Sequence, residues 1–195
     1  FVGSTLILYL FSVLVSIFSK DILEKFEYDD IARILVSVPG VNVRLEDGYG
    51  LRPNIGFRGV TPERSKKINI MEDGLLIGPA PYSAPAAYFF PLTSKMVGVE
   101  VTKGPAAIKY GPNTVAGALN LITRSVPANN EGELDVALGN DGYQKGHAYH
   151  GFNITDELGV LVAGITLRSD GFQELRNGGG VGFEKDETKI KHASV

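Results

Sequence analysis

Short runs in which apolar and polar residues alternate recur along this chain, and turn residues separate them. Leu134, Val136 and Leu138 form one such run, and the turn at Asp141-Gly142 follows it. Alternation with a period of two is the pattern of a strand with one buried face. The 24 glycines among 195 residues supply the tight turns that short strands need. The chain is therefore predicted to be rich in β-structure.

Charge and composition argue against several classes of function. The net charge of −3 and the isoelectric point near 5.6 disfavour nucleic-acid binding, because few phosphates would be neutralised. No cysteine is present, which removes disulfides, thiol nucleophiles and Cys-based zinc sites. GPAAIKYG lacks the Lys-Ser/Thr pair of a phosphate loop, and no acid/base pair or hydrolase motif stands out. We therefore predict that the protein is not an enzyme and has no catalytic residues and no cofactor.

The three histidines do not suggest a metal site. His147 and His150 lie three residues apart, so they would face opposite sides of one strand, and His192 is remote in sequence. No metal is predicted.

Residues 1–20 form an apolar N-terminal segment with no charge before Lys20. Its first residue is Phe rather than Met, so the natural chain is expected to start upstream. The run reaches the lower length limit of a membrane-spanning helix and is also typical of a signal-peptide core, although the basic region of a signal peptide is missing. Two interpretations stay open for residues 1–12: an export or anchor segment, or the approach to a first strand that begins near Val13.

Residues 21–126 have the pattern of a small α+β domain. A short amphipathic helix is predicted over 29–38, capped by Asp29 or Asp30 and ended by Pro39-Gly40. Short strands are predicted around Val41 and Val43, Ile55 and Phe57, Val97 to Val101, and the run from Ala116 to Thr123.

Two turns punctuate this region. KINIMEDGLLIG is the clearest hairpin, because Asp73-Gly74 tolerates the positive φ angles of a tight turn. KGPAAIKYGPN predicts a compact turn or a single helical turn before the next strand.

Residues 127–195 predict three to four antiparallel strands. Leu161, Ala163, Ile165 and Leu167 form one face of a strand of about ten residues, a length and alternation that fit the wall of a transmembrane β-barrel. A soluble β-sandwich produces the same alternation, and the pattern alone favours it.

Four sequence blocks together resemble the plug domain of TonB-dependent outer-membrane receptors. They are LVSVPGVNV, NIGFRG, NIMEDGLL and VEVTKGPAAIKYGPNTVAGALNLIT, in the order and with the spacing of that family. By this resemblance the structural plug motif consists of Pro39, Gly40, Arg58, Gly59, Asp73, Gly74, Lys103, Gly104, Pro105, Tyr110, Gly111, Asn120 and Thr123.

Within the family, MEDGLLIGPAPYSAPAAYFFP is similar to the ferric-citrate receptor branch, which implies that the plug apices contact an iron chelate. The implied ligand-binding residues are Arg58, Tyr82, Ser83, Tyr49 and Arg52. A guanidinium suits an anionic chelate, although Arg58 also fits a purely structural Arg-Gly turn. Ala84 and Ala86 stand where that branch carries glutamines, which makes citrate itself a poor match.

The resemblance implies an architecture of three parts: residues 1–20 leading into the plug, a plug over 21–126, and the first barrel strands over 127–195. A barrel of about 22 strands has a lumen too wide to close itself, so the plug must fill it. The implied partners are an iron chelate or similar small nutrient, a TonB-type energy-transducing protein of the inner membrane, and the lipid of the outer membrane of a Gram-negative bacterium. No TonB-binding motif is identifiable in the chain.

Two rival functions stay open at this point. The region could be a stand-alone plug-like binding or regulatory module without transport activity, or a soluble β-rich adhesion or structural protein. The coding sequence beyond Val195 would discriminate between these functions, because open sheet edges do not span lipid.

Overall fold

The computed structural model describes residues 15–26, 30–46, 52–77, 90–155, 157–170 and 190–194. The chain divides into two compact units, Phe1–Arg124 and Ser125–Val195, here called unit 1 and unit 2. The boundary predicted from the sequence lies two residues later, after residue 126. In the described residues, no helix is both long and apolar enough to cross a membrane.

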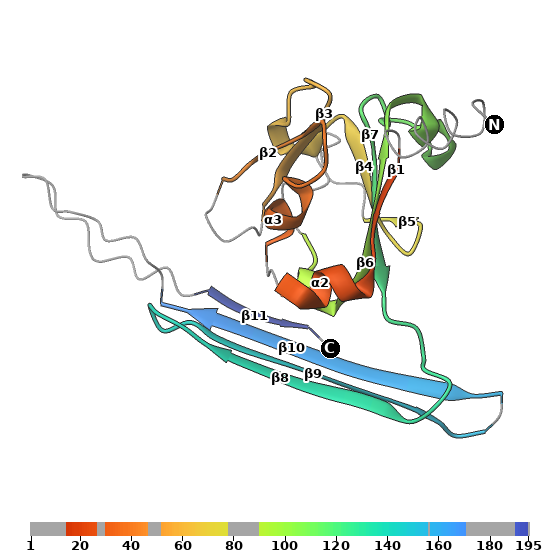
Figure 1. Cartoon of the computed structure of the whole chain (residues 1–195), viewed down its shortest axis with the longest axis vertical. Helices are drawn as coiled ribbons and strands as arrows, with labels where there is room; N and C mark the ends of the chain where they lie inside the picture. Colours follow the sequence, from red (N-terminus) through yellow and green to blue (C-terminus); the bar gives the residue numbers. More distant parts are fainter. Residues whose placement is uncertain are drawn as a thin grey trace, which may run out of the picture. The chain divides into compact units, whose positions relative to one another are not determined.

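Unit 1 is built on a five-stranded sheet with the strand order β1-β6-β7-β4-β5 (Figure 1). Its strands are β1 (Val15–Phe18), β4 (Ile68–Glu72), β5 (Leu75–Leu76), β6 (Met96–Lys103) and β7 (Gly117–Thr123). All neighbours are antiparallel except β4 and β7, which run parallel. The predicted hairpin is confirmed, because β4 and β5 pair around Asp73 (φ 49°) and Gly74 (φ 80°). The parallel pairing of β4 with β7 left no local signal in the sequence.

The predicted helix is present but shorter than 29–38. It is α3 (Ile31–Leu35), and the Asp30 side chain caps it by accepting a hydrogen bond from the Ala32 N–H at 2.8 Å. The chain beyond α3 forms turns that lead to Gly40, whose φ of 77° suits glycine. A second helix, α2 (Lys20–Phe26), was not predicted.

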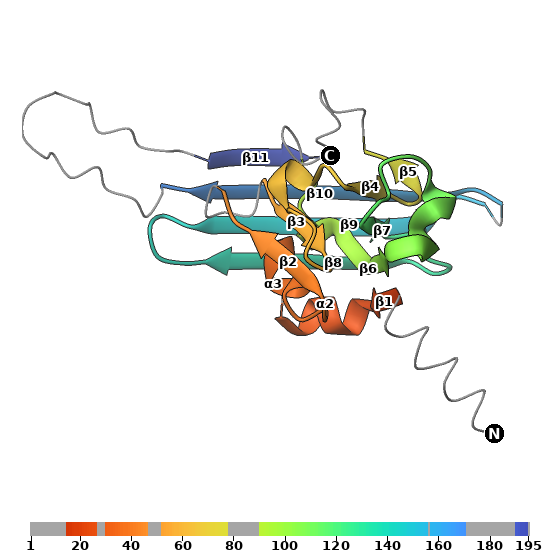
Figure 2. The same cartoon turned by 90° about the horizontal axis from the view of Figure 1, so that it is seen from above.

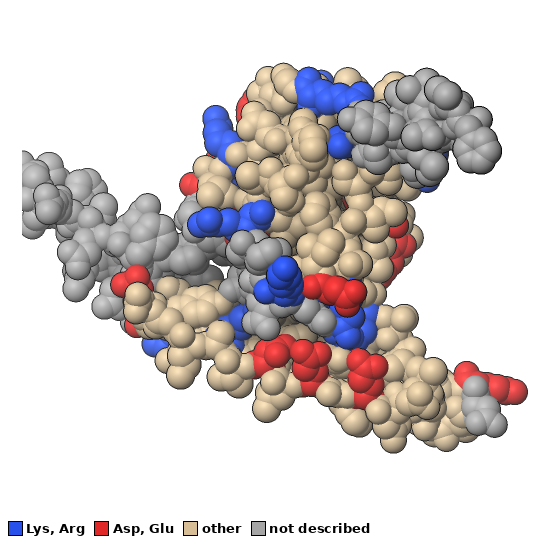
Figure 3. All heavy atoms as spheres, in the orientation of Figure 1, with Lys and Arg blue, Asp and Glu red and all other residues tan. Residues whose placement is uncertain are grey.

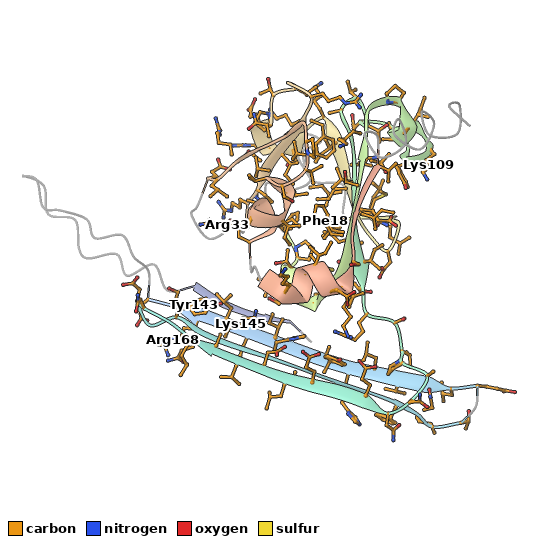
Figure 4. The ribbon with its side chains drawn as sticks, viewed as in Figure 1. Phe18, Arg33, Lys109, Tyr143, Lys145 and Arg168 are labelled. Atoms are coloured by element: carbon orange, nitrogen blue, oxygen red, sulfur yellow. The ribbon has the colours of Figure 1, made fainter. Side chains whose placement is uncertain are left out.

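A core lies on one face of the five-stranded sheet. Figure 1 shows α3 and a separate hairpin of β2 (Val41–Arg44) and β3 (Asn54–Phe57) on that side. The buried side chains there include Leu35, Phe57, Ile70, Val99, Val101, Leu119 and Leu121. Phe18 of β1 packs against this core and is turned toward it in Figure 4. The other face carries a smaller cluster, Met71, Ala107 and Ala118, which the 3₁₀ segment η4 (Gly104–Tyr110) helps to form.

Unit 2 is one antiparallel sheet with the order β11-β10-β9-β8, and Figure 2 shows its strands side by side. The strands are β8 (Glu131–Leu138), β9 (Gln144–Asn153), β10 (Gly159–Ser169) and β11 (Ile190–Ser194). The chain reverses between β8 and β9 at Asp141 (φ 55°) and Gly142 (φ 66°), as predicted.

The register of unit 2 determines which apolar residues share a face of its sheet. Leu134 is opposite Ala148, whereas Glu133 is opposite Tyr149, which in turn is opposite Ala163. Directly opposed residues share a face. The apolar residues Leu134, Val136 and Leu138 of β8 therefore lie on the opposite face from Leu161, Ala163, Ile165 and Leu167 of β10. The sheet does not have a single apolar side built from both sets, because pairing through β9 sets the register.

Candidate functional site

The residues predicted to bind ligand do not form one described group. Tyr49, Tyr82 and Ser83 lie outside the described residues. Arg52 and Arg58 are both exposed, and they flank β3 at its two opposite ends. The structure therefore does not bring these two arginines together.

Arg58 lies where two glycine turns of the plug motif meet. Its backbone has a left-handed φ of 51°, and its N–H donates to the Gly40 carbonyl at 2.7 Å. A Cβ added to Gly40 would lie 3.7 Å from the Arg58 Cγ, and one added to Gly104 would lie 3.3 Å from its Nη1. The side chain therefore passes beside both glycines, and a larger residue at Gly104 would crowd the guanidinium. Gly59 follows with a φ of 81° and completes the turn.

Lys103 ends β6 beside the same turns, and its side chain is 2% exposed. Its Nζ donates to the Pro39 carbonyl at 3.2 Å and lies 3.5 Å from the Ser16 Oγ. Burial, and secondarily the positive charge of Arg58, lowers the pKa of Lys103. Desolvation disfavours the ammonium form, and a like charge acts in the same direction.

Pro39, Gly40, Arg58, Lys103 and Gly104 thus form one group, here called the Arg58 cluster. Among the residues that the structure describes, neither cation of this cluster forms an ion pair with a carboxylate. The exposed guanidinium has donors available, and donors in this planar geometry match carboxylate and phosphate oxygens. The cluster can therefore accept an anion at the exposed Arg58 head, while Lys103 holds the Pro39 turn in place.

A second group of motif residues lies at the opposite end of the sheet. Lys103 is paired with Gly117 at the start of β7, whereas Thr123 ends the same strand. Both carboxylate oxygens of Asp73 accept from Thr123, one from its N–H at 2.9 Å and the other from its hydroxyl. Asn120 Oδ1 accepts from the Gly74 N–H at 2.9 Å. These four residues are here called the Asp73 cluster.

The remaining motif residues belong to η4 and its end. Pro105 stands in the first turn of η4, where a missing N–H is harmless. The buried Asn69 donates from Nδ2 to the Tyr110 carbonyl at 2.8 Å, and Gly111 (φ 96°) terminates the segment. Lys109, labelled in Figure 4, lies over the Tyr110 ring with its Nζ 4.7 Å from the centroid.

Sequence reasoning missed a buried polar network that holds the chain after Arg52. The Ser65 Oγ accepts from the Ile55 N–H and donates to the Pro53 carbonyl, both at 3.0 Å. Asn54 Oδ1 accepts from the Arg64 N–H at 2.5 Å. No spacing or motif singles out these residues, because the chain brings them together only through the turn after β3.

The two faces of unit 2 differ in chemistry. On the face that contains Glu133, the Tyr149 phenol oxygen lies 2.9 Å from Glu131 Oε1 and 3.1 Å from Glu133 Oε2. On the same face, His147 Nδ1 lies 3.3 Å from Asp135 Oδ2. Figure 3 shows acidic side chains grouped along this unit. This face is here called the Glu133 face.

The opposite face, here called the Leu134 face, leaves large apolar side chains uncovered. Leu134, Val136 and Leu138 are 73%, 68% and 79% exposed, and Val162 joins them. His150 lies on this face and His147 on the other, as predicted. Within the described part of the chain, no group of three or more potential ligand side chains could hold a metal ion.

Comparison with known proteins assigns the family. The family described as "TonB-dependent Receptor Plug Domain" matches residues 11–118. The chain is 29% identical over 182 residues to the vitamin B12 transporter BtuB of Photobacterium profundum, covering 93% of this chain and 28% of that protein. It is 25% identical over 178 residues to the transporter of the same name from Vibrio vulnificus, covering 91% and 27%. The chain thus spans little more than a quarter of these relatives.

Solved receptor structures share the fold. The siderophore receptor PirA from Acinetobacter baumannii matches with a TM-score of 0.60 and 22% identity, covering 80% of this chain and 24% of that one. FpvAI, in its complex with pyocin S2, matches with a TM-score of 0.68 and 16% identity, covering 82% and 20%. Because these matches cover about four fifths of the chain, the structural similarity includes part of unit 2 as well as unit 1. With more than half of its length matched by the family, this chain belongs to the TonB-dependent receptor plug domain family.

Proposed function

We propose that this chain forms the plug and the first wall strands of an outer-membrane receptor that imports a scarce nutrient. In this proposal unit 1 fills the lumen of a barrel and unit 2 begins its wall, in the outer membrane of a Gram-negative bacterium. The named relatives are transporters and receptors, and we propose no enzymatic role. The single observation that carries the proposal is the contrast between the two faces of β8, which exposes Leu134, Val136 and Leu138 on one side and carries Glu131 and Glu133 on the other, directly after a plug domain.

That contrast suits a wall between lipid and a wet lumen. The exposed Leu134, Val136 and Leu138 would face acyl chains, where apolar side chains need no hydrogen-bond partner. The Glu131, Glu133 and Tyr149 group would face the lumen, where water and the plug can satisfy its polar atoms. A soluble sandwich would instead have to bury the Leu134 face against a second sheet.

The cargo that we propose is an iron chelate, such as ferric citrate or a siderophore, or a comparable bulky nutrient such as vitamin B12. The relatives reported above are named for vitamin B12 and for siderophores, and the resemblance of the plug apex to the ferric-citrate branch stays a prediction. Arg58 is the proposed anion contact, because its guanidinium is exposed and has no carboxylate partner in the described residues. Tyr49, Arg52, Tyr82 and Ser83 stay proposed contacts. A TonB-type protein of the inner membrane is the proposed source of energy.

The test is a binding panel on the full receptor. Ferric dicitrate, a ferric hydroxamate, a ferric catecholate and cobalamin are titrated against the wild type and Arg58→Asn. Asn tolerates the left-handed backbone of position 58, so the substitution removes the charge with little strain. Arg64→Asn is the matched control, because Arg64 is also exposed and also has a φ of 51°.

We expect one of the four ligands to bind, and an anionic ligand to bind about tenfold or more weakly to Arg58→Asn. An unchanged affinity for every anionic chelate would remove Arg58 from the binding site. Failure of all four ligands to bind the receptor would count against the cargo classes named here.

The second candidate is a plug-like binding module that never forms a pore. The observation in its favour is that unit 1 has a buried core of its own, formed within residues 31–121. Expression of residues 1–124 alone decides between the two: a fragment that folds and binds ligand with the affinity of the full chain supports the module. Ligand binding that requires the strands after residue 124 supports the receptor.

A further inference from the structure

The Asp73 cluster lies at the point where the chain leaves unit 1. Thr123 is the last residue of β7, and the division between the units follows at Arg124. Asp73 and Gly74 belong to a different part of the sheet, the turn between β4 and β5. Contacts between Asp73 and Thr123 therefore join residues fifty positions apart at the exit of the chain.

The hydrogen bonds in this group form a continuous chain across three strands. The Asp73 N–H donates to the Leu121 carbonyl at 2.9 Å, while the Asp73 carboxylate accepts from the N–H and the hydroxyl of Thr123. The Asn120 side chain accepts from the Gly74 N–H and donates to Glu100 Oε2 of β6 at 3.1 Å. The β4–β5 turn is thus bound to the last residues of β7 from both sides, and β7 is bound to β6.

Backbone pairing between the strands would by itself hold the end of β7 only weakly. The parallel register of β4 with β7 stops at Glu72 and Leu121, two residues short of the end of β7. The antiparallel register of β6 with β7 continues to the end of β7, with Thr123 opposite Met96, but it shifts between Met96 and Gly98. Hydrogen bonds to charged groups are about twice as strong as neutral ones, so the Asp73 carboxylate holds Thr123 on the β4 side with two strong bonds, beyond the point where the β4–β7 ladder stops.

We propose that Asp73, Asn120 and Thr123 form an exit clamp that fixes the end of β7 to the β4–β5 turn and so sets where the link to unit 2 leaves unit 1. Without the clamp, Ile122 and Thr123 are held only by their irregular pairing with β6, and the end of β7 frays. The clamp acts on the end of β7 and contributes little to the core of unit 1, because Asp73 and Thr123 lie at the end of the sheet and their hydrogen bonds are exposed.

Two variants release the clamp without disturbing the turn. Thr123→Val keeps the shape of the side chain and removes only the hydroxyl donor. Asp73→Gly removes the carboxylate and keeps the left-handed backbone, which glycine adopts freely. Asp141→Gly is the matched control, since Asp141 (φ 55°) also precedes a glycine in a left-handed turn and belongs to unit 2.

The measurement is amide hydrogen exchange of the full chain, comparing Thr123 and Gly74 with the central amides of Ile70 and Leu119. We expect Asp73→Gly to speed exchange at Thr123 by about tenfold to a hundredfold, and Thr123→Val to speed exchange at position 123 by about tenfold. Exchange at Ile70 and Leu119 should stay within about threefold of the wild type, and Asp141→Gly should change none of the four.

Two outcomes would overturn the proposal. Unchanged exchange at position 123 in both variants would show that the ladder holds the exit without the clamp. Equal acceleration at the exit and at Ile70 and Leu119 would show that the cluster supports the whole sheet and has no separate role at the exit.

Discussion

Unit 1 and unit 2 place their apolar side chains differently. In unit 1 Leu119 is 0% exposed, because α3 and the β2–β3 hairpin cover one face of its sheet. In unit 2 Leu138 is 79% exposed, because the sheet is a single layer. A sheet normally needs a second layer to bury its apolar face. Unit 1 contains its own second layer, and unit 2 depends on surroundings that lie outside its four strands.

The polar groups of the two units also differ in how far apart in sequence their hydrogen-bond partners lie. The motif residues of unit 1 make hydrogen bonds over long sequence separations, such as Lys103 to Pro39 and Asp73 to Thr123. The polar groups of unit 2 contact their neighbours on the adjacent strand, as Tyr149 contacts Glu131 and Glu133. Contacts between segments far apart in sequence therefore hold unit 1 in one arrangement, whereas these polar contacts of unit 2 link adjacent strands.

The largest expected effect is the cost of a leucine truncation in the core of unit 1. Leu119→Ala should lower the free energy of unfolding by about 2 to 5 kcal/mol, because a buried cavity remains. Leu138→Ala, the same substitution at an exposed position, should change it by less than about 0.5 kcal/mol in water. Urea unfolding followed by circular dichroism measures both. Equal costs would break the contrast between the two units.

The next effect tests the proposal that the Leu134 face of unit 2 meets lipid. In the full receptor, Val136→Lys should destabilise the folded state in a bilayer by about 2 to 4 kcal/mol if position 136 lies near the midplane. Ala137→Lys places the same charge one residue further along β8 on the Glu133 face, where a lumen can solvate it, and should cost much less. Reversible folding into lipid vesicles gives the comparison. A larger cost for Ala137→Lys would assign the faces the other way round.

A smaller loss of stability is expected when the hydroxyl of Tyr149 is removed. Tyr149→Phe removes the donor shared by Glu131 and Glu133 and leaves two carboxylates beside an apolar ring. The expected loss of stability is about 1 kcal/mol, since the two glutamates are exposed and water replaces part of the bond. A double-mutant cycle with Glu131→Gln and Glu133→Gln measures the coupling. If the stability changes of Tyr149→Phe and of the glutamate substitutions simply add, the Tyr149 hydroxyl makes no stabilising interaction with the two glutamates.

The smallest effect is a pH dependence that belongs to unit 1 alone. The folded state lowers the pKa of Lys103, so the unfolded chain binds the proton more tightly. The stability of unit 1 should therefore rise as the pH rises from the lowered pKa to the usual lysine value, and should be constant with respect to this group below and above that window. Lys103→Met should abolish this rise in a series of urea titrations. A rise of the same size in Lys103→Met would assign it to another group.

Local features of unit 1 were predictable from the sequence. The Asp73-Gly74 hairpin follows from two residues that tolerate positive φ, and the capping of α3 follows from the Asp30 side chain, which accepts from an N–H two positions away. Such features depend on a few residues that are neighbours in the chain, so they can be predicted from the local sequence. The helix α2 was missed, and α3 is shorter than its apolar spacing suggested, because Val38 enters the core from a turn.

The candidate site was predictable only as a set of residues. The blocks around Arg58, Asp73 and Lys103 were recognisable by resemblance, but no spacing indicated that they separate into two clusters at opposite ends of one sheet. The side-chain networks of Ser65 and Asn69 gave no signal either, since their partners are set by turns and by pairing between distant strands.

By itself, the sequence determined where strands and turns occur and which family the plug resembles, because both depend on residues close together in the chain. The tertiary structure decided how those strands pair: the parallel neighbours β4 and β7, and the register that puts Leu134, Val136 and Leu138 of β8 on the opposite face from Leu161, Ile165 and Leu167 of β10. Pairing joins residues that are far apart in sequence, and a shift of one residue moves every side chain to the other face. Alternation shows that a strand has two faces, and only the neighbouring strands decide what each face meets.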